Sequence, residues 1–152
     1  MSDDNNANIR FVVIDTQEQW QQVRAIRQRV FVEEQSCPPE EEWDVYDKSS
    51  HHILGTLDGE PIAAARWRQI GDRTGRSAKL ERFAVLPEGR GHGLGRKVIE
   101  FTLADAAAAG HRRFMLHAQA HLENLYASFG FVTKGARFME AGIPHVEMVL
   151  ER

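Results

Sequence analysis

The chain has 152 residues, of which 42% are hydrophobic, a length that suits one compact domain with a buried core and is too short for two. Its formal net charge of −3 arises from plentiful acidic and basic residues, which excludes a general electrostatic affinity for nucleic acid or anionic lipid and requires any anion site to be local. A single cysteine, Cys37, excludes an intrachain disulfide and a cysteine-rich zinc site, and it favours a reducing compartment.

The N-terminal segment MSDDNNAN is polar and acidic, and it lacks the basic start and apolar stretch of a signal peptide. No apolar run approaches membrane-spanning length. We therefore expect residues 1–8 to be disordered, residues 9–152 to form a single domain, and the protein to be cytoplasmic without a membrane partner.

The first half of the chain predicts a strand, a helix and a long loop. Ile9–Ile14 is rich in β-branched residues, as strands are. Thr16–Gln19 has the form of a capping box, and apolar residues at helical spacing then predict a helix to about Val32. The acidic segment 33–50, with its paired prolines, predicts a loop with at most one short helix.

The rest of the chain predicts strands and helices in alternation. Asp58-Gly59, between two strand-like runs, is a strong signal for a two-residue hairpin. The later predicted elements are a polar turn around Asp72 to Gly75, a strand Ala78–Val85, a helix Leu94–Ala109 capped by Gly110, a strand Phe114–Ala118, a helix Leu122–Phe129, and strands Phe131–Phe138 and His145–Leu150 around Ala141-Gly142. This order predicts a mixed α+β sheet with crossover connections in its second half.

Three alternating glycines, Gly91, Gly93 and Gly95, lie between a predicted strand and the start of a predicted helix. Backbone amides there can converge on one anion, and Arg90 and Arg96-Lys97 add positive charge beside the helix N-terminus. Two nucleotide-binding motifs do not fit this segment. A Rossmann pattern would require glycine at position 96, which is arginine, and a Walker pattern would require Lys-Ser or Lys-Thr after Gly95, which Arg96-Lys97 follows instead. By itself the segment predicts a phosphate site or a plain tight turn.

Two motifs together resemble those of the GNAT N-acetyltransferases. Val85-x-Pro87-x-x-Arg90-Gly91-x-Gly93-Leu94-Gly95 is similar to the family's acetyl-CoA signature, Arg/Gln-x-x-Gly-x-Gly/Ala after a strand. Tyr126-Ala127-Ser128-Phe129-Gly130-Phe131 resembles its Tyr-x-x-x-Gly-Phe segment. The order of predicted elements is also the family's, so the resemblance covers almost the whole chain. It implies the GNAT fold, a mixed, mostly antiparallel sheet of about seven strands flanked by about four helices.

Three further segments resemble the ElaA-type and YjcF-type branch of this superfamily. They are Arg27-x-x-Val30-Phe31-Val32-x-Glu34-Gln35 followed by Cys37-Pro38, then Ala118-Gln119-Ala120-His121-Leu122, and Gly142-Ile143-Pro144-His145-Val146-Glu147-Met148. This closer resemblance makes the expected fold more specific, but it says little about the identity of the acceptor.

The resemblance implies acetyl-CoA as cosubstrate. Backbone groups at the end of a strand would pair with the pantetheine arm, and amides of the glycine turn would receive the pyrophosphate. The residues expected to bind the cofactor are Phe83, Ala84, Val85, Arg90, Gly91, His92, Gly93, Leu94, Gly95 and Arg96. Histidines such as His51-His52 and the scattered acids lack metal-ligand spacing, so we expect no metal.

Acyl transfer from a thioester to an amine requires deprotonation of the amine, stabilisation of an oxyanion and protonation of the thiolate. Tyr126 occupies the family's tyrosine position, and a phenol is protonated at neutral pH, so we expect it to be the acid, with packing as the alternative. The resemblance places the oxyanion at a backbone amide near Ala84 or Val85.

Glu81 is the predicted base, because it precedes the expected CoA contacts and alternation gives it the parity of Phe83 and Val85. The alternative is a strand carboxylate in a salt bridge with Arg82 or Lys79.

The acceptor pocket is expected near Glu33, Glu34 and Gln35, where this family usually builds it and where carboxylates suit a cationic amine. A solvated helix end explains these residues nearly as well. His117 has the pKa range for proton transfer, with a hydrogen-bonded core role as its alternative, and we expect His145 to contact the acceptor. Cys37 is expected to be structural, since the family's chemistry proceeds by direct attack.

These features predict an N-acetyltransferase that moves an acetyl group to a primary amine of a small molecule or protein in a ternary complex. The alternative is a non-catalytic acyl-CoA sensor with the same fold. Acylation of charged tRNA is disfavoured by the net negative charge, so no nucleic acid partner is expected. The resemblance also admits a homodimer formed through the final strands.

Overall fold

The computed structural model describes residues 8–72 and 75–152. The predicted disorder of the N-terminus, apart from Asn8, and the centre of the turn predicted around Asp72 to Gly75 lie outside these ranges.

The described residues form one seven-stranded sheet, with the strand order β1-β2-β3-β4-β5-β7-β6. The strands are β1 Ile9–Val13, β2 His51–Leu57, β3 Glu60–Asp72, β4 Gly75–Val85, β5 Arg113–Gln119, β6 Val132–Glu140 and β7 Ile143–Glu151. Every neighbouring pair is antiparallel except β4 and β5, which are parallel because a helical crossover connects them. The predicted mixed, mostly antiparallel sheet is confirmed.

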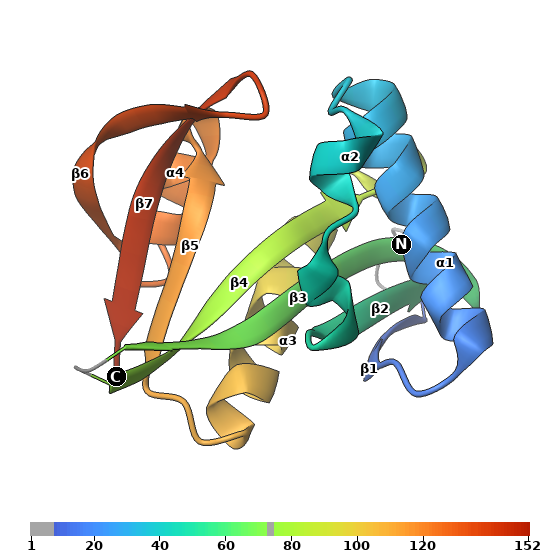
Figure 1. Ribbon diagram of the computed structural model, residues 1–152. Coiled ribbons are helices and arrows are strands. Elements are labelled where there is room, and N and C mark those ends of the chain that lie inside the picture. The colour runs from blue at the N-terminus through green and yellow to red at the C-terminus, as the bar shows by residue number, and fades with distance from the viewer. Residues whose placement is uncertain (1–7, 73–74) are drawn as a thin grey trace.

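In the part of the chain that the structure describes, four α-helices flank the sheet: α1 Gln17–Arg27, α2 Pro39–Glu42, α3 Leu94–Ala108 and α4 Glu123–Ala127. The capping box is confirmed, since the Thr16 hydroxyl accepts a 3.1 Å bond from the Gln19 amide and the Gln19 side chain accepts one from Thr16. After Arg27 the winding changes to a π-helix, Gln28–Glu34, which carries the helical segment past its predicted end. Figure 1 shows α1 and α2 on one face of the sheet and α3 on the other.

The predicted loop of residues 33–50 is more ordered than expected. It holds α2 and also a 3₁₀ turn, Val45–Lys48, so the expectation of at most one short helix was wrong. Pro39 stands at the first position of α2, where a missing N–H costs nothing. The Asp44 side chain caps the next turn by accepting a 3.0 Å bond from the Tyr46 amide.

Both predicted two-residue turns are confirmed. Asp58 and Gly59 adopt φ values of 51° and 85°, and Ala141 and Gly142 adopt 51° and 76°. Positive φ at both central residues is the geometry of a type I′ hairpin, whose twist matches that of the strands it joins.

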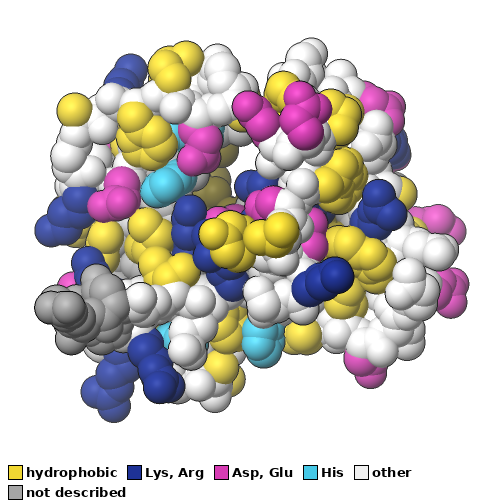
Figure 2. Space-filling view, viewed as in Figure 1, with side chains coloured by type: hydrophobic (Ala, Val, Ile, Leu, Met, Phe, Trp, Pro, Cys, Tyr) yellow, Lys and Arg dark blue, Asp and Glu magenta, His cyan; other side chains and the backbone are white. Residues whose placement is uncertain are grey.

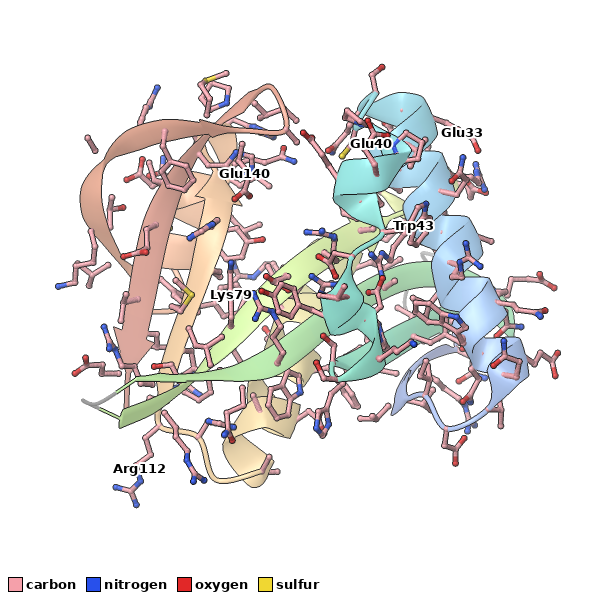
Figure 3. The ribbon with its side chains drawn as sticks, in the orientation of Figure 1. Glu33, Glu40, Trp43, Lys79, Arg112 and Glu140 are labelled. Atoms are coloured by element: carbon pink, nitrogen blue, oxygen red, sulfur yellow. The ribbon has the colours of Figure 1, made fainter. Side chains whose placement is uncertain are left out.

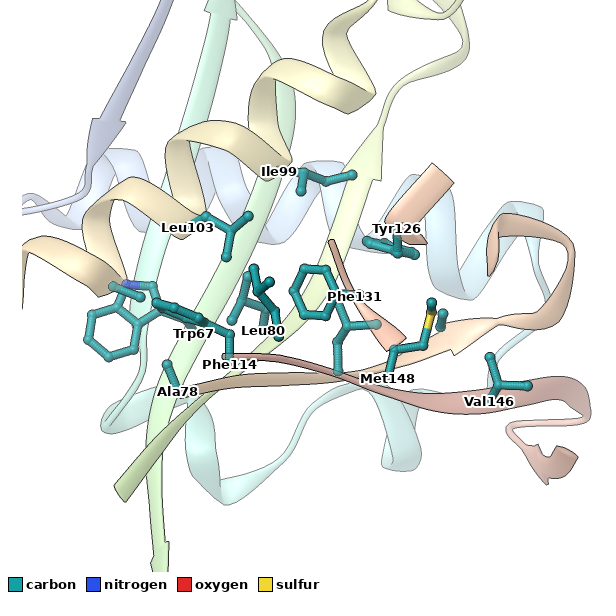
Figure 4. Close-up of a cluster of buried hydrophobic side chains, with 14 residues drawn as sticks. Trp67, Ala78, Leu80, Ile99, Leu103, Phe114, Tyr126, Phe131, Val146 and Met148 are labelled. Carbon is teal, nitrogen blue, oxygen red and sulfur yellow. The ribbon is translucent and has the colours of Figure 1, made fainter. Parts of the chain in front are cut away.

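Two hydrophobic cores lie against the sheet, and Phe83 packs on both. Figure 4 shows one of them, where Ile99 and Leu103 of α3 and Tyr126 of α4 face Leu80 of β4 and side chains of the later strands. The other core joins α1 and the N-terminal part of α3 to strands β2 to β4. The sheet is therefore anchored in two halves that meet at β4.

The strands β4 and β5 part soon after they meet. Their only paired residues in the described chain are Ala78 with Phe114 and Lys79 with Met115. Figure 1 shows β5, β7 and β6 leaning away from the rest of the sheet above this point.

A bulge in β4 accompanies the divergence. Ala64 faces Ala84 and Arg66 faces Glu81, so two residues of β4, including Arg82 at φ 60°, lie opposite a single residue of β3. The extra residue shifts the alternation of side chains. The predicted shared parity of Glu81 and Phe83 was therefore wrong: Glu81 contacts Arg66, whereas Phe83 packs against Tyr126 on the opposite face, with 6.0 Å between ring centroids.

Candidate active site

A cavity of about 460 Å³ opens where β4 and β5 diverge. Its walls come from β4, from β5 with the β6–β7 turn, and from the segment between the π-helix and the 3₁₀ turn. Figure 2 shows this hollow between the two halves of the molecule, with acidic, basic and histidine side chains at its rim. Both separating strand edges line it, and a strand edge without a partner can hydrogen-bond an extended, amide-containing ligand.

Tyr126 reaches the cavity from α4 and is 5% exposed. Its ring lies between Phe83 and Phe131, with centroid distances of 6.0 and 6.2 Å. Burial raises the pKa of the Tyr126 phenol above its usual range, because the charged form would lose its hydration. The side chain is therefore a protonated hydroxyl at neutral pH, as a proton donor must be.

Glu81 also lines the cavity, but three cations hold its carboxylate. The distances are 2.7 Å to the Arg66 guanidinium, 3.2 Å to the Lys79 ammonium and 3.3 Å to Arg68. Burial alone would raise the pKa of Glu81, yet these charges, Arg66 above all, lower it to about 2. So weak a base is poorly suited to accept an amine proton. The geometry favours the alternative, in which Glu81 forms salt bridges. Of the two partners named for it, Lys79 contacts Glu81 and Arg82 does not.

Two arginines, each 1% exposed, bind three carboxylates of the neighbouring segment 33–50. Arg27 contacts Glu42 at 2.8 Å and Asp47 at 2.7 Å. Arg66 contacts Asp44 at 2.8 Å and Asp47 at 2.6 Å. The sequence predicted only that the acidic segment 33–50 forms a loop. Its paired carboxylates instead anchor one wall of the cavity to α1 and β3, which no local sequence signal indicated.

Of the three residues expected at the acceptor pocket after the first helix, only Gln35 lines the cavity, where its side chain accepts a 3.1 Å bond from Gln119. Glu34 instead accepts two bonds from the Arg90 guanidinium, at 2.5 and 2.6 Å. Glu33 is exposed, and Figure 3 shows it pointing away from the hollow. A helical turn spreads consecutive side chains around its axis, so three neighbours do not share one face.

The glycine turn joins the end of β4 to the start of α3. Gly91 and Gly93 have φ values of 86° and 75°, a backbone region that side-chain-bearing residues rarely adopt, and Gly93 is the N-cap of α3. The amides at the first turn of this 15-residue helix, together with its dipole, make the segment fit for a phosphate group. The expected cofactor-binding residues from Phe83 to Arg96 thus lie along one continuous path from the cavity to this turn.

The side chains of two basic residues at this turn already have protein partners. Arg90, besides its bonds to Glu34, donates a 3.0 Å bond from Nε to the Val85 carbonyl. Arg96 donates to the Ser128 hydroxyl at 2.9 Å and lies over the Phe129 ring. Arg90 therefore connects the turn to the π-helix, and Arg96 connects it to the end of α4.

A histidine pair and a shared carboxylate form the wall opposite β4. His117 Nδ1 lies 3.0 Å from Glu140 Oε1, and His145 Nε2 lies 3.6 Å from Glu140 Oε2. The hydrogen bond with His117 lowers the pKa of Glu140, although burial opposes this effect. Both histidines were predicted site residues. Glu140 was missed, and its position directly before the Ala141-Gly142 turn was the signal that could have indicated it.

Within residues 8–72 and 75–152, no group of three or more His, Cys, Asp or Glu side chains is arranged to hold a metal ion. In the same ranges, no helix has the length and apolar character needed to cross a membrane.

Residues 11–152 match the model of the acetyltransferase (GNAT) domain. The uncharacterized N-acetyltransferase YjcF of Bacillus subtilis is 38% identical over 93% of this chain and 99% of its own. Among solved structures, Escherichia coli ElaA is 30% identical, with a TM-score of 0.82 over 95% of this chain and 99% of its own. An acyl-CoA N-acyltransferase from Pseudomonas aeruginosa is 29% identical, with the same TM-score and the same two coverages.

Proposed function

Because the chain belongs to the GNAT acetyltransferase family, in its ElaA-like and YjcF-like branch, and is an acyltransferase, we propose that it moves an acetyl group from acetyl-CoA to a primary amine. Both substrates bind together, and the amine attacks the thioester directly. The observation that carries this proposal is the divergence of β4 and β5, with Tyr126 in the wall of the opening and the glycine turn at its end. The unit that acts is a single domain of residues 9–152.

The residues along β4 and the glycine turn fit acetyl-CoA. The separated edges of β4 and β5 offer backbone groups to the amides of the pantetheine arm, and the amides from Gly91 to Arg96 receive the pyrophosphate. Positive φ at Gly91 and Gly93 supports this assignment, since such a turn presents its amides outward without side chains in the way. The related P. aeruginosa protein is described as an acyl-CoA N-acyltransferase, which agrees with a CoA thioester as donor.

Two groups of the chain then assist the transfer of the acetyl group. A backbone amide near Ala84 or Val85, beyond the bulge, stabilises the oxyanion that forms when the amine attacks the thioester carbonyl. Tyr126 donates its phenolic proton to the departing thiolate, and its raised pKa keeps that proton available. The cavity of about 460 Å³ accommodates a small amine or a lysine side chain of a protein.

Replacing Tyr126 with Phe tests this proposal. Release of the CoA thiol from acetyl-CoA is measured with a panel of primary amines, and the dissociation constant for CoA is measured by calorimetry. We expect the variant to lose about 100-fold or more in kcat, the usual contribution of a general acid, while its affinity for CoA stays within about twofold. A wild-type protein that binds acetyl-CoA and releases no thiol with any amine would instead support the acyl-CoA sensor.

A further inference from the structure

His145 carries its basic nitrogen on the side of the ring that faces Glu140. Its Nδ1 lies 2.7 Å from the backbone carbonyl oxygen of Ile143, and a carbonyl can only accept a hydrogen bond. The proton of the neutral ring therefore resides on Nδ1, and the lone pair on Nε2. His145 is 7% exposed and lines the cavity.

Glu140 places a second acceptor beside that lone pair. Its Oε2 lies 3.6 Å from His145 Nε2, while its Oε1 accepts the bond from His117. When the imidazole is neutral, both His145 Nε2 and Glu140 Oε2 are hydrogen-bond acceptors, so neither can donate to the other. A primary ammonium group has three donor hydrogens and a positive charge, so it complements the pair in geometry and in charge.

The charged groups around this pair favour a cation. Glu41 of α2 contributes a carboxylate to the cavity wall, whereas Glu147 of β7, 3.8 Å from His117 Nε2, does not line the cavity. Three cations, Arg68, Lys79 and Arg82, also line the cavity, and each is engaged by a carboxylate. Lys79 and Arg68 lie 3.2 and 3.3 Å from Glu81, and Arg82 lies 2.7 Å from Glu42. Phe138 packs against both histidines, with centroid distances of 5.0 and 6.1 Å, and limits their movement.

We propose that the ammonium of the acceptor binds between His145 Nε2 and Glu140 Oε2, and that His145 takes its proton. This assignment rests on the proposed acetyl transfer and replaces Glu81, whose carboxylate is bound by three cations. Glu140 stabilises the resulting imidazolium, and His117 acts as a positioning residue that orients Glu140.

The acceptor nitrogen gives one proton to Nε2 and attacks the thioester carbonyl, so that a C–N bond forms and the C–S bond breaks. The nitrogen loses its second proton to water as the amide forms, and the sulfur receives one proton from Tyr126. Tyr126 and His145 re-equilibrate with solvent, and each turnover releases one net proton.

The kinetic test compares His145→Gln and Glu140→Gln with the wild type and uses n-butylamine as the probe. Thiol release is followed from pH 5 to 9, which spans the range of about pH 5 to 8 in which imidazole titrates. Wild-type kcat/KM should rise about tenfold per pH unit on the acid side and then level off. In His145→Gln the plateau should vanish, and kcat/KM should keep rising about tenfold per pH unit up to pH 9, because the rate then follows the small fraction of neutral amine. Its kcat should also be at least about tenfold lower. Glu140→Gln should raise KM for the amine about tenfold or more.

Glu147→Gln is the matched control, because it removes a carboxylate near His117 that does not line the cavity. We expect it to change kcat and KM by less than about twofold. The proposal is overturned if kcat/KM of His145→Gln levels off with pH as the wild type does, or if Glu147→Gln raises KM as much as Glu140→Gln does.

A second measurement needs no turnover and so separates this proposal from the proposed function. In protein labelled with ¹³C-histidine, n-butylammonium chloride should shift the His145 imidazole resonance in the presence of CoA, and Glu140→Gln should abolish the shift. Loss of thiol release with this shift intact would count against acetyl transfer only. An unperturbed His145 resonance in CoA-bound wild type would overturn the ammonium site.

Discussion

Gly93 and Gly95 stand two positions apart in the turn that we assign to the CoA pyrophosphate, yet their backbones differ. Gly93 has φ 75°, whereas Gly95 belongs to α3 and has no positive φ. A Cβ atom added at either position would meet no protein atom within 4 Å. The two positions therefore differ in backbone conformation and not in available space. The family pattern accepts alanine only at the position of Gly95.

Gly93→Ala is expected to destabilise the fold by about 1–2 kcal/mol, the cost of a left-handed conformation for a residue with a side chain. It should also weaken CoA binding about tenfold, because relief of the strain moves the converging amides. Gly95→Ala, the matched control, should keep CoA affinity and gain up to about 1 kcal/mol from helix propensity. Urea denaturation and calorimetry measure both effects, and equal CoA affinities in the two variants would argue for a plain turn.

Among the elements, the bulge of β4 is held in place from outside the sheet. Arg82, the bulge residue at φ 60°, lies 2.7 Å from the Glu42 carboxylate and 3.2 Å from that of Asp44. Both acids belong to the segment of α2 and the 3₁₀ turn. The loop that forms one wall of the cavity thus also fixes the distortion that opens β4.

Comparing Arg82→Ala with Arg82→Gly separates backbone strain from the ion pairs. Both variants lose the pairs with Glu42 and Asp44, but glycine adopts a positive φ without cost. We expect Arg82→Ala to be less stable than Arg82→Gly by about 1 kcal/mol in chemical denaturation. Identical stabilities would show that the bulge relaxes once the arginine is absent.

Across the whole molecule, one ion network connects α1, the acidic loop, β3 and β4. Arg27 and Arg66 share Asp47, and Arg66 continues to Glu81 on β4. Charges buried in this way destabilise a fold strongly when one partner is removed. Global stability should therefore respond to the protonation of the network.

Glu81→Gln should lower the free energy of unfolding at pH 7 by up to about 3 kcal/mol, from a pKa of about 2 in the folded state and an ordinary value of 4.5. Since the folded-state pKa of Glu81 is depressed, its contribution is present above pH 4.5 and is lost as pH falls toward 2. The gap between variant and wild type should close over that window in urea titrations. Glu151→Gln, at an exposed pair with Arg113, should change stability by less than about 0.5 kcal/mol at any of these pH values.

The order of elements, the two hairpin turns, the capping box and the family motifs were determined by the sequence itself, because each depends on residues near one another along the chain. Thr16 with Gln19, and Asp58 with Gly59, specify their local conformations through contacts within a few residues. Tyr126 and the glycine turn were found in the same way, through spacing that a short segment carries complete.

Only the tertiary structure decided which side chains face each other across the cavity. The bulge at Arg82 turned Glu81 away from Phe83, and Arg66, Arg68 and Lys79 then bound its carboxylate. Glu140 lies beside His145 because the hairpin of β6 and β7 brings the two residues together. Such contacts depend on strand register and on desolvation, which arise when distant segments pack. For this reason the sequence could not show that the carboxylate of Glu81, the base it predicted, is bound by three cations in the folded chain.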